Sequence, residues 1–580
     1  MNQKKNETAT LICEKSERYF EIASVIILLT LGVYQSIILF GHKVVPISDF
    51  SSFVKTGHEI LALKIPTSFK LAPVTGILEI LFGKILGGQY PDLMGGWLLN
   101  SVLHPLNLVL FWLIGKRIIG KTAVWFAVIA SIIPWTLYMV REPLAETTLL
   151  FFVMFTIYLI YRRSRWAYLF ASITTMVRYE GAALIMAAFV MDMINSENRK
   201  QRWFALFYSA IASVPLALWL VGTFLKMDTA SANNYLAVFT KDYSKHFNES
   251  KSDRTGIVMH LQLIWFVGFK PLFMISPTSN KDSLELLFFV SKSIALISFI
   301  FGAVYGLVKR NWYILILLIF LVPYFLIHAF YPYPIPRFHA TSFWIALLIS
   351  LFGLRQVWTA VKTKLRLSAT AGLFLSAIVL VAAFLLTLPL ISYMPKLAQI
   401  SSVVKWLPYI AISGVAALLL FRCFFEKFRF VLRDIAIATF MGFIIISNQF
   451  SLAPLLLDGK QDIEFKYLAD WYIKNAAPDE KMAVYMGGTV KVFAPKFENS
   501  FAGFPAADSP QELAEKLRNE NITYVVWATR EGLSNDHYDY HRLNLDKNIA
   551  FLRNAKDIGP YKFVAQVKGE RGYVNIFRLN

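Results

Sequence analysis

The stretch of sequence that decides the fold is RRSRWAYLFASITTMVRYEGAALIMAAFVMDMINSENRKQR, residues 162–202. It is basic at both ends, and basic loops of membrane proteins gather on the cytosolic side. Only two apolar runs, 166–177 and 181–194, lie between these ends. A helix of about 12 residues reaches roughly 18 Å, short of the roughly 30 Å hydrocarbon core of a bilayer. We therefore predict two short helices that meet at 178–180, near the outer half of the membrane.

The composition of the whole chain supports a membrane protein. Of its 580 residues, 56% are hydrophobic and only 17% are charged, with a mean hydropathy of +0.51. Soluble domains average about 45–50% apolar and 25% charged residues. The formal net charge is +20, yet residues 459–580 hold 17 Lys and Arg against 16 Asp and Glu. The basic excess therefore belongs to the apolar part of the chain, and no nucleic-acid partner is expected.

The first apolar run, 20–40, follows Lys4, Lys5, Lys15 and Arg18. It is about 21 residues long, enough to cross a bilayer. A signal peptide would have a shorter apolar region of about 7–15 residues and a small-residue cleavage site. This run ends instead in GHKVVP, so we predict a retained span with a cytosolic N-terminus.

Further apolar runs predict the remaining spans. Together with the short pair they give an α-helical polytopic protein of about 13 membrane helices, with the C-terminus outside. The predicted cytoplasmic-membrane spans after the first are 97–114, 122–140, 143–161, 203–224, 286–308, 312–330, 339–358, 368–392, 406–421 and 435–456.

The charges agree with this topology. Short loops assigned to the inside carry several Lys and Arg residues, as at 309–310 and 422–433, whereas short outer connections carry single ones such as Arg141. Cys13 and Cys423 both fall on the predicted inside, which argues against a disulfide framework.

We divide the chain into a transmembrane domain, 1–458, with large outer loops at 42–96 and 226–283, and an extracytoplasmic α/β domain, 459–580. In this tail a helical pattern at 461–476 precedes the strand-like KMAVYM, and PQELAEKLRNEN precedes ITYVVWA. The closing YKFVAQVKGERGYVNIFRLN predicts a hairpin. The tail has no phosphate loop, metal-ligand spacing or Ser-His-Asp pattern, so a packing or acceptor-docking role is favoured over catalysis.

The first outer loop carries Asp49 within a few residues of the membrane face. A carboxylate there can act as a general base on an acceptor hydroxyl. The alternative, slightly favoured by position alone, is a helix N-cap. The following segment, 71–87, is apolar but includes Glu79 and Lys84, which favours a helix lying along the interface over one that crosses it.

Two further places put ionisable side chains at membrane depth. The sequence PWTLYMVREPLAETTLLFF places Arg141 and Glu142 at the outer surface and Glu146 about one turn into the next span. Arg178 and Glu180 lie where the two short helices meet. Such groups usually face the bundle interior and are functional candidates, although a structural ion pair of Arg178 with a carboxylate is the alternative.

A proline-rich turn follows the span at 312–330. In HAFYPYPIPRFHATSFW, three prolines stiffen the chain before Arg337 and His339. Arginine suits a phosphate through its forked donors, and contact with lipid headgroups is an equally supported alternative. His104, inside a span, is interpreted as a core histidine with its hydrogen bonds satisfied.

These pieces together resemble the GT-C-fold membrane glycosyltransferases. They are ISDFSSFVKTGHEIL after the first span, REPLAETTLLFF, the RRSRWAYLFASITTMVRYEGAALI pair, PRFHATSFW and the outer α/β tail. The pattern is similar to the bacterial lipid-A aminoarabinose transferase and the protein O-mannosyltransferases, over the whole chain in order and topology. REPLAET and VRYEG are its most specific motifs.

The resemblance implies sugar transfer from a polyprenyl-phosphate donor to a lipid, glycan or protein acceptor at the outer face. It implies Asp49 as catalytic base, Glu146 in the same cavity, and Lys70, Arg178 and Arg337 around the donor phosphate. Arg141, Glu142, Glu180 and His339 are further cavity candidates. The acidic-then-basic pair of the aminoarabinose transferases is Phe69-Lys70 here, so the case for a divalent metal is weak and no cofactor is assigned.

Two alternatives stay open. A transporter or flippase for lipid-linked glycans would show two similar halves and charges at the bilayer midplane, and the sequence has no internal repeat. A glycan polymerase or ligase would use a lipid-pyrophosphate donor. A cavity open to the outer leaflet and containing Asp49 and Glu146 would favour transfer.

Overall fold

The computed structural model describes residues 2–47, 49–69, 71–225, 282–329, 339–364 and, with short gaps, 459–580. The gaps in this last range are 461, 485–486, 506, 508, 529–548 and 571. Several predictions concern residues outside the described part: residues 226–281 of the second outer loop, the spans 368–392, 406–421 and 435–456, and the candidates Lys70 and Arg337.

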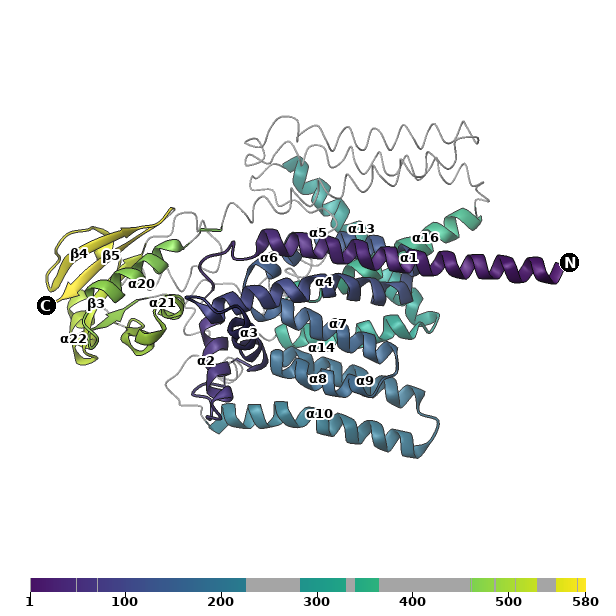
Figure 1. Ribbon diagram of the computed structural model, residues 1–580, viewed down its shortest axis with the longest axis horizontal. Coiled ribbons are helices and arrows are strands. Elements are labelled where there is room, and N and C mark those ends of the chain that lie inside the picture. The colour runs from purple at the N-terminus through teal and green to yellow at the C-terminus, as the bar shows by residue number, and fades with distance from the viewer. Residues whose placement is uncertain are drawn as a thin grey trace.

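Long apolar helices lie roughly parallel and build a bundle (Figure 1). In the described part of the chain, four helical stretches are long and apolar enough to cross a membrane, and a bent pair adds a fifth. Most lie where spans were predicted. The helices are α1 (Asn2–Leu39), α4 (Pro91–Ile119), α7 (Ala145–Tyr161), α10 (Arg199–Leu225), α13 (Asp282–Val308), α14 (Trp312–Ala329) and α16 (Phe343–Lys364).

The predicted span 122–140 is broken into two helices, α5 (Ala123–Ile132) and α6 (Pro134–Arg141). Proline lacks the N–H that a continuous helix needs but suits the first position of a new one, so the chain breaks at Ile133. A second break follows at once, because α6 and α7 are bent by 118°. This second break is the Glu142-Pro143-Leu144 segment.

The two short helices are confirmed as α8 (Trp166–Val177) and α9 (Ala182–Asn195), joined by the 3-10 turn Tyr179–Gly181. Their close approach needs a glycine, since a Cβ built on Gly181 would lie 2.5 Å from the carbonyl carbon of Thr174.

Two helices of the first outer loop, α2 (Asp49–Leu61) and α3 (Val74–Leu86), lie across one end of the bundle (Figure 1). Glycines let the backbones touch: a Cβ on Gly76 would lie 1.9 Å from the carbonyl oxygen of Phe53, and one on Gly95 equally close to that of Glu79. The stack α2–α3–α4 is therefore tightly packed, and α3 lies across the end of the bundle, as predicted for 71–87.

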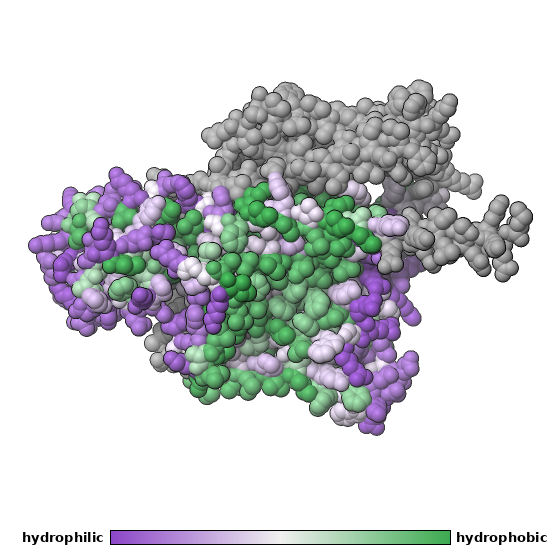
Figure 2. All heavy atoms as spheres, in the orientation of Figure 1, coloured by the Kyte–Doolittle hydropathy of each residue, from purple (hydrophilic) through white to green (hydrophobic). Residues whose placement is uncertain are grey.

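On the face drawn in Figure 2, an apolar band lies across the middle of the described part of the molecule, between two hydrophilic ends. The N-terminus of α1 and the C-terminal domain lie at opposite ends (Figure 1). A band of this kind is what a membrane protein presents to lipid. We call the end that carries α2, α3 and the C-terminal domain the loop end, and the other the N-terminal end.

The tail is a mixed α/β domain with a five-stranded sheet of order β2-β1-β3-β5-β4. β2, β1 and β3 are parallel, and β5 runs antiparallel to both β3 and β4. The predicted helices, strands and closing hairpin are confirmed as α20 (Ile463–Asn475), β1 (Lys481–Ala483), α22 (Pro510–Asn519), β3 (Ile522–Ala528), β4 (Tyr561–Lys568) and β5 (Tyr573–Leu579). The helix α21 (Gly487–Phe493) and the strand β2 (Phe501–Ala502) were not predicted.

The tail packs directly on the loop end of the bundle. Phe50 of α2 and Leu144 of the break belong to one buried cluster with Phe465 and other tail residues. The rings of Tyr90 and Phe493 meet at 5.3 Å between centroids. One buried hydrophobic cluster therefore joins the first outer loop, the α6–α7 break and the tail, and fixes their positions relative to one another.

Candidate active site

Arg178 is the centre of a buried cluster of ionisable groups. Its Nε donates to Glu180 Oε1 at 3.1 Å, and its Nη2 lies 3.0 Å from the same oxygen. Its Nη1 donates to Glu146 Oε1 at 3.2 Å. The three side chains are 14%, 7% and 5% exposed. Glu146, Arg178 and Glu180, which the sequence singled out separately, thus lie together, and Arg178 has the carboxylate pairing that the structural alternative described.

Two histidines from the next pair of helices line the same cluster. His328, near the end of α14, places Nε2 3.3 Å from Glu180 Oε1. The His339 ring lies 5.4 Å from the His328 ring, and both side chains are buried. His339 was predicted as a cavity residue, whereas His328 was not singled out. The sequence did contain a signal for His328, because an ionisable side chain near the end of an apolar run is a functional candidate.

The first outer loop is tied to this cluster through the backbone of Phe69. The Tyr179 hydroxyl donates to the Phe69 carbonyl at 2.6 Å, and the Trp219 indole N–H donates to it at 3.0 Å. Tyr179 stands between Arg178 and Glu180 in the chain. The residue that precedes Lys70 is therefore anchored at the meeting point of α8 and α9, although Lys70 itself lies outside the described residues.

Arg141 and Glu142 form a separate pair at the α6–α7 break. Arg141 Nη2 donates to Glu142 Oε1 at 2.9 Å, and the guanidinium lies over the Tyr138 ring. Both side chains are buried, and their place at the outer membrane surface stays a prediction. The Asn100 side chain of α4 donates to the Glu142 carbonyl, and the tail covers the break at Leu144. The segment between α6 and α7 is therefore held by contacts with α4 and with the tail.

Asp49 is the first residue of α2 and is half-buried. Residues four apart lie on one face of a helix, so Asp49 shares a face with Phe53, which belongs to the buried core of the bundle. This places Asp49 on the bundle side of α2. Its role as base or as helix start remains a prediction.

Glu79 of α3 is a buried acid beside these elements. It is 1% exposed, and its Oε2 has no hydrogen-bond partner among the described residues. Its Oε1 lies next to Gly96, where Pro143 and Phe50 also approach. Burial raises the pKa of Glu79 well above its ordinary value, and the charges of Asp92 and Glu146 raise it further. The raised pKa favours the protonated form of Glu79, which lies between the Asp49 helix and the break.

A cavity of about 290 Å³ opens between α2 and the tail. His58 Nε2 lies 2.8 Å from Asp92 Oδ2 across it, and Lys55 Nζ lies 3.0 Å from Glu498 Oε1. The hydrogen bond to Asp92 raises the pKa of His58. Hydroxyls of Ser51 and Ser52 line the same wall. Charged and apolar side chains of both domains line the cavity, and Asp49 and Glu146 are not among its lining residues.

Other sequence expectations have plain outcomes. His104 is a satisfied core histidine, with its Nε2 2.7 Å from Gln35 Oε1. Among the described residues, no three His, Cys, Asp or Glu side chains come together as a metal site.

The fold is that of GT-C membrane glycosyltransferases. ArnT from Cupriavidus metallidurans, solved bound to undecaprenyl phosphate, matches with a TM-score of 0.52 at 13% identity, over 95% of this chain and 97% of that one. The oligosaccharyltransferase AglB from Archaeoglobus fulgidus, solved with an inhibitory peptide and a dolichol-phosphate, matches with a TM-score of 0.50 at 12% identity, over 95% and 80%.

The same archaeal enzyme tethered to an acceptor peptide gives a TM-score of 0.51 at 13% identity, over 95% of this chain and 74% of that one. No protein-family model and no curated protein sequence matches the chain. At such low identity these likenesses show the fold, and the fold confirms the resemblance drawn from the sequence.

Proposed function

We propose that the protein transfers a sugar from a polyprenyl-phosphate donor to an acceptor hydroxyl or amide at the outer face of the membrane. The observation that carries this proposal is the buried cluster of Glu146, Arg178 and Glu180. It lies at the loop end of a GT-C bundle and is tied to the first outer loop through Phe69. Two proteins of the same fold were solved with polyprenyl-type phosphates.

For a hydroxyl acceptor, Asp49 is proposed as the general base. It takes the proton of the acceptor as the acceptor oxygen bonds to the anomeric carbon of the sugar. The bond from that carbon to the phosphate oxygen breaks, and the polyprenyl phosphate leaves with the electron pair. Attack opposite the leaving group inverts the anomeric centre. The position of Asp49 on the bundle side of α2 is compatible with this role.

The leaving phosphate needs cations, and the proposed ones are Lys70, Arg178 and Arg337. Arg178 already binds two carboxylates, so a phosphate must compete with Glu146 and Glu180 for it. We propose that this competition is used: donor binding draws the guanidinium toward the phosphate and leaves Glu146 less neutralised. A carboxylate close to the sugar then stabilises the positive charge that develops at the anomeric carbon.

The acceptor is proposed to enter from the tail side. The cavity between α2 and the tail has hydroxyl, carboxylate and ammonium groups, which suit a polar acceptor such as a glycan or a peptide. The packing of the tail on α2 fits the docking role expected from its sequence. An extracytoplasmic tail and a cytosolic N-terminus in the cytoplasmic membrane complete the proposal.

The test is purified full-length protein in detergent, supplied with a panel of polyprenyl-phosphate sugars and hydroxyl acceptors. Release of free polyprenyl phosphate together with a glycosylated acceptor supports the proposal. Turnover only with polyprenyl-pyrophosphate donors would assign a polymerase or ligase. Movement of intact lipid-linked sugar across liposomes, without cleavage, would assign a flippase.

A further inference from the structure

A second cavity lies at the opposite end of the bundle from the candidate active site. Its volume is about 460 Å³, and it is walled by the ends of α4, α7 and α13, the start of α14, and side chains of α9 and α16. α4 and α7 both begin near the α2–α3 end and run away from it, so their last residues, near Arg117 and Arg163, lie at the N-terminal end (Figure 1). This cavity belongs to no part of the proposed reaction.

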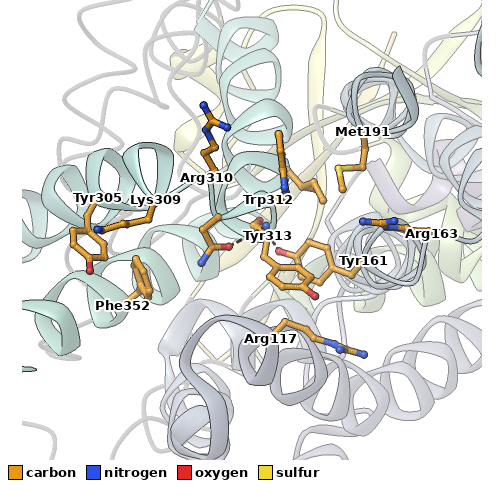
Figure 3. Close-up of a pocket in the computed structure, with 12 residues that line it drawn as sticks. Arg117, Tyr161, Arg163, Met191, Tyr305, Lys309, Arg310, Trp312, Tyr313 and Phe352 are labelled. Atoms are coloured by element: carbon orange, nitrogen blue, oxygen red, sulfur yellow. Dashed lines mark hydrogen bonds between the residues drawn. The ribbon is translucent and has the colours of Figure 1, made fainter. Parts of the chain in front are cut away.

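The lining of the cavity is cationic and aromatic. Arg117, Arg163, Lys309 and Arg310 contribute four positive charges, and none of the lining residues is acidic. In the described part of the chain, no carboxylate pairs with any of these four cations. Figure 3 shows Arg117 and Arg163 near the rings of Tyr161 and Tyr313, Lys309 beside Tyr305, and Arg310 extending away from these rings. All four side chains are exposed, so solvent screens their mutual repulsion, and an anion placed between them would be attracted by each.

Tyr161 and Tyr313, which line the cavity, are joined by a hydrogen bond and a ring contact. The Tyr161 hydroxyl donates to the Tyr313 carbonyl at 2.8 Å, and the two rings meet edge to face. Asn311 caps α14 by accepting the N–H of Tyr313 at 3.1 Å. Arg163 and Arg310 both have a φ of 53°, a left-handed conformation that favours glycine or asparagine. Both turns are also closed by a backbone hydrogen bond, from the Arg163 N–H to the Ile160 carbonyl and from the Arg310 N–H to the Leu307 carbonyl, each at 2.9 Å.

A general excess of cations on the cytosolic side of membrane proteins explains positive charge at this end, but it does not require the charges to converge on one hollow. Apolar surface adjoins the cations. Leu307 and Val308 are 45% and 73% exposed directly before Lys309, and Trp312 is 37% exposed. The cavity therefore offers a place for a phosphate beside a place for acyl chains.

We propose that this cavity binds the headgroup of an anionic phospholipid in the leaflet opposite the candidate active site, with the phosphate among the four cations and the acyl chains along α13. Basic pockets between membrane helices on the cytosolic side are suited to such headgroups. Because the lipid would join α4, α7 and the α13–α14 turn, its binding should stabilise the N-terminal end of the bundle.

The test measures thermal stability and lipid retention, by native mass spectrometry, of full-length protein in detergent. The probes are phosphatidylglycerol, cardiolipin, phosphatidylcholine and soluble glycerol phosphate. The anionic lipids should raise the melting temperature and be retained, whereas phosphatidylcholine and glycerol phosphate should not. Each removed cation is worth about 1 kcal/mol near a lipid surface, so the double variant Arg117→Gln/Lys309→Gln should bind phosphatidylglycerol roughly 30-fold more weakly.

The matched control is Arg162→Gln/Arg199→Gln, which removes two exposed cations near the same end but outside the cavity lining. It should bind within about twofold of the wild type, because surface charges act only weakly at a distance. A second cavity variant, Arg163→Gln/Arg310→Gln, removes the other two cations and should weaken lipid binding in the same way, so the test does not depend on the folding of the first variant alone. Equal loss in control and cavity variants, equal binding of phosphatidylcholine, or equally tight glycerol phosphate would each overturn the proposal.

Discussion

The buried cluster at Arg178 makes a quantitative prediction about stability. Arg178→Met removes the guanidinium from between Glu146 and Glu180, whose side chains are 5% and 7% exposed. Methionine keeps much of the volume, so the main effect is two carboxylates left without their cation. Breaking a buried ion pair in this way costs about 3–5 kcal/mol. We expect that loss in the free energy of unfolding, measured by denaturant titration in detergent at neutral pH.

A mutant cycle separates charge from packing. The triple variant Arg178→Met/Glu146→Gln/Glu180→Gln removes the stranded charges, and it should recover to within about 1–2 kcal/mol of the wild type, because replacing a whole buried ion cluster is often nearly neutral. Arg162→Met, an exposed cation close by in the chain, should change stability by less than about 0.5 kcal/mol. The reasoning is refuted if the triple variant is as unstable as Arg178→Met.

Three further predictions concern the loop end of the molecule. Since burial raises the pKa of Glu79, the wild type should lose stability as pH rises from 4.5 through that raised pKa, and Glu79→Gln should lose this dependence in melting curves across pH. Since Asp92 raises the pKa of His58, their contact should stabilise the protein below pH 6.5 and weaken as pH rises through the raised pKa; His58→Gln should flatten that part of the curve. Protease added outside intact spheroplasts should remove 459–580 and spare 422–433, and the opposite pattern would reverse the orientation.

Helices and strands that depend on neighbouring residues in the chain could be predicted from the sequence. The α8–α9 pair followed from helix length alone, because about 12 residues cannot cross a bilayer. The tail strands and closing hairpin followed from alternation and glycine spacing. Pro134 is a local signal for the break at Ile133, but the apolar run around it led to the prediction of one continuous span, 122–140.

Features that depend on tertiary contact could not be predicted in the same way. The sequence indicated that Glu146, Arg178 and Glu180 are functional candidates, but not that Arg178 binds both carboxylates at once. The sequence placed Glu79 on a helix at the membrane interface. Its burial depends on the close packing of α3 against α4, which Gly95 permits. Arg141 and Glu142 are buried beside a break whose Glu142 carbonyl accepts from Asn100 and whose Leu144 packs against the tail.

The most direct test of the proposed transfer is the turnover of Asp49→Asn with a donor that the wild-type protein accepts. Asparagine keeps the shape of the side chain and can begin a helix as aspartate does, but it cannot take the acceptor proton. The measurement is the rate of polyprenyl phosphate release in detergent, with donor binding measured in parallel. The account predicts a rate roughly 10²–10⁴-fold lower with donor binding nearly unchanged. Full activity of Asp49→Asn would contradict it and leave Asp49 as the residue that starts α2.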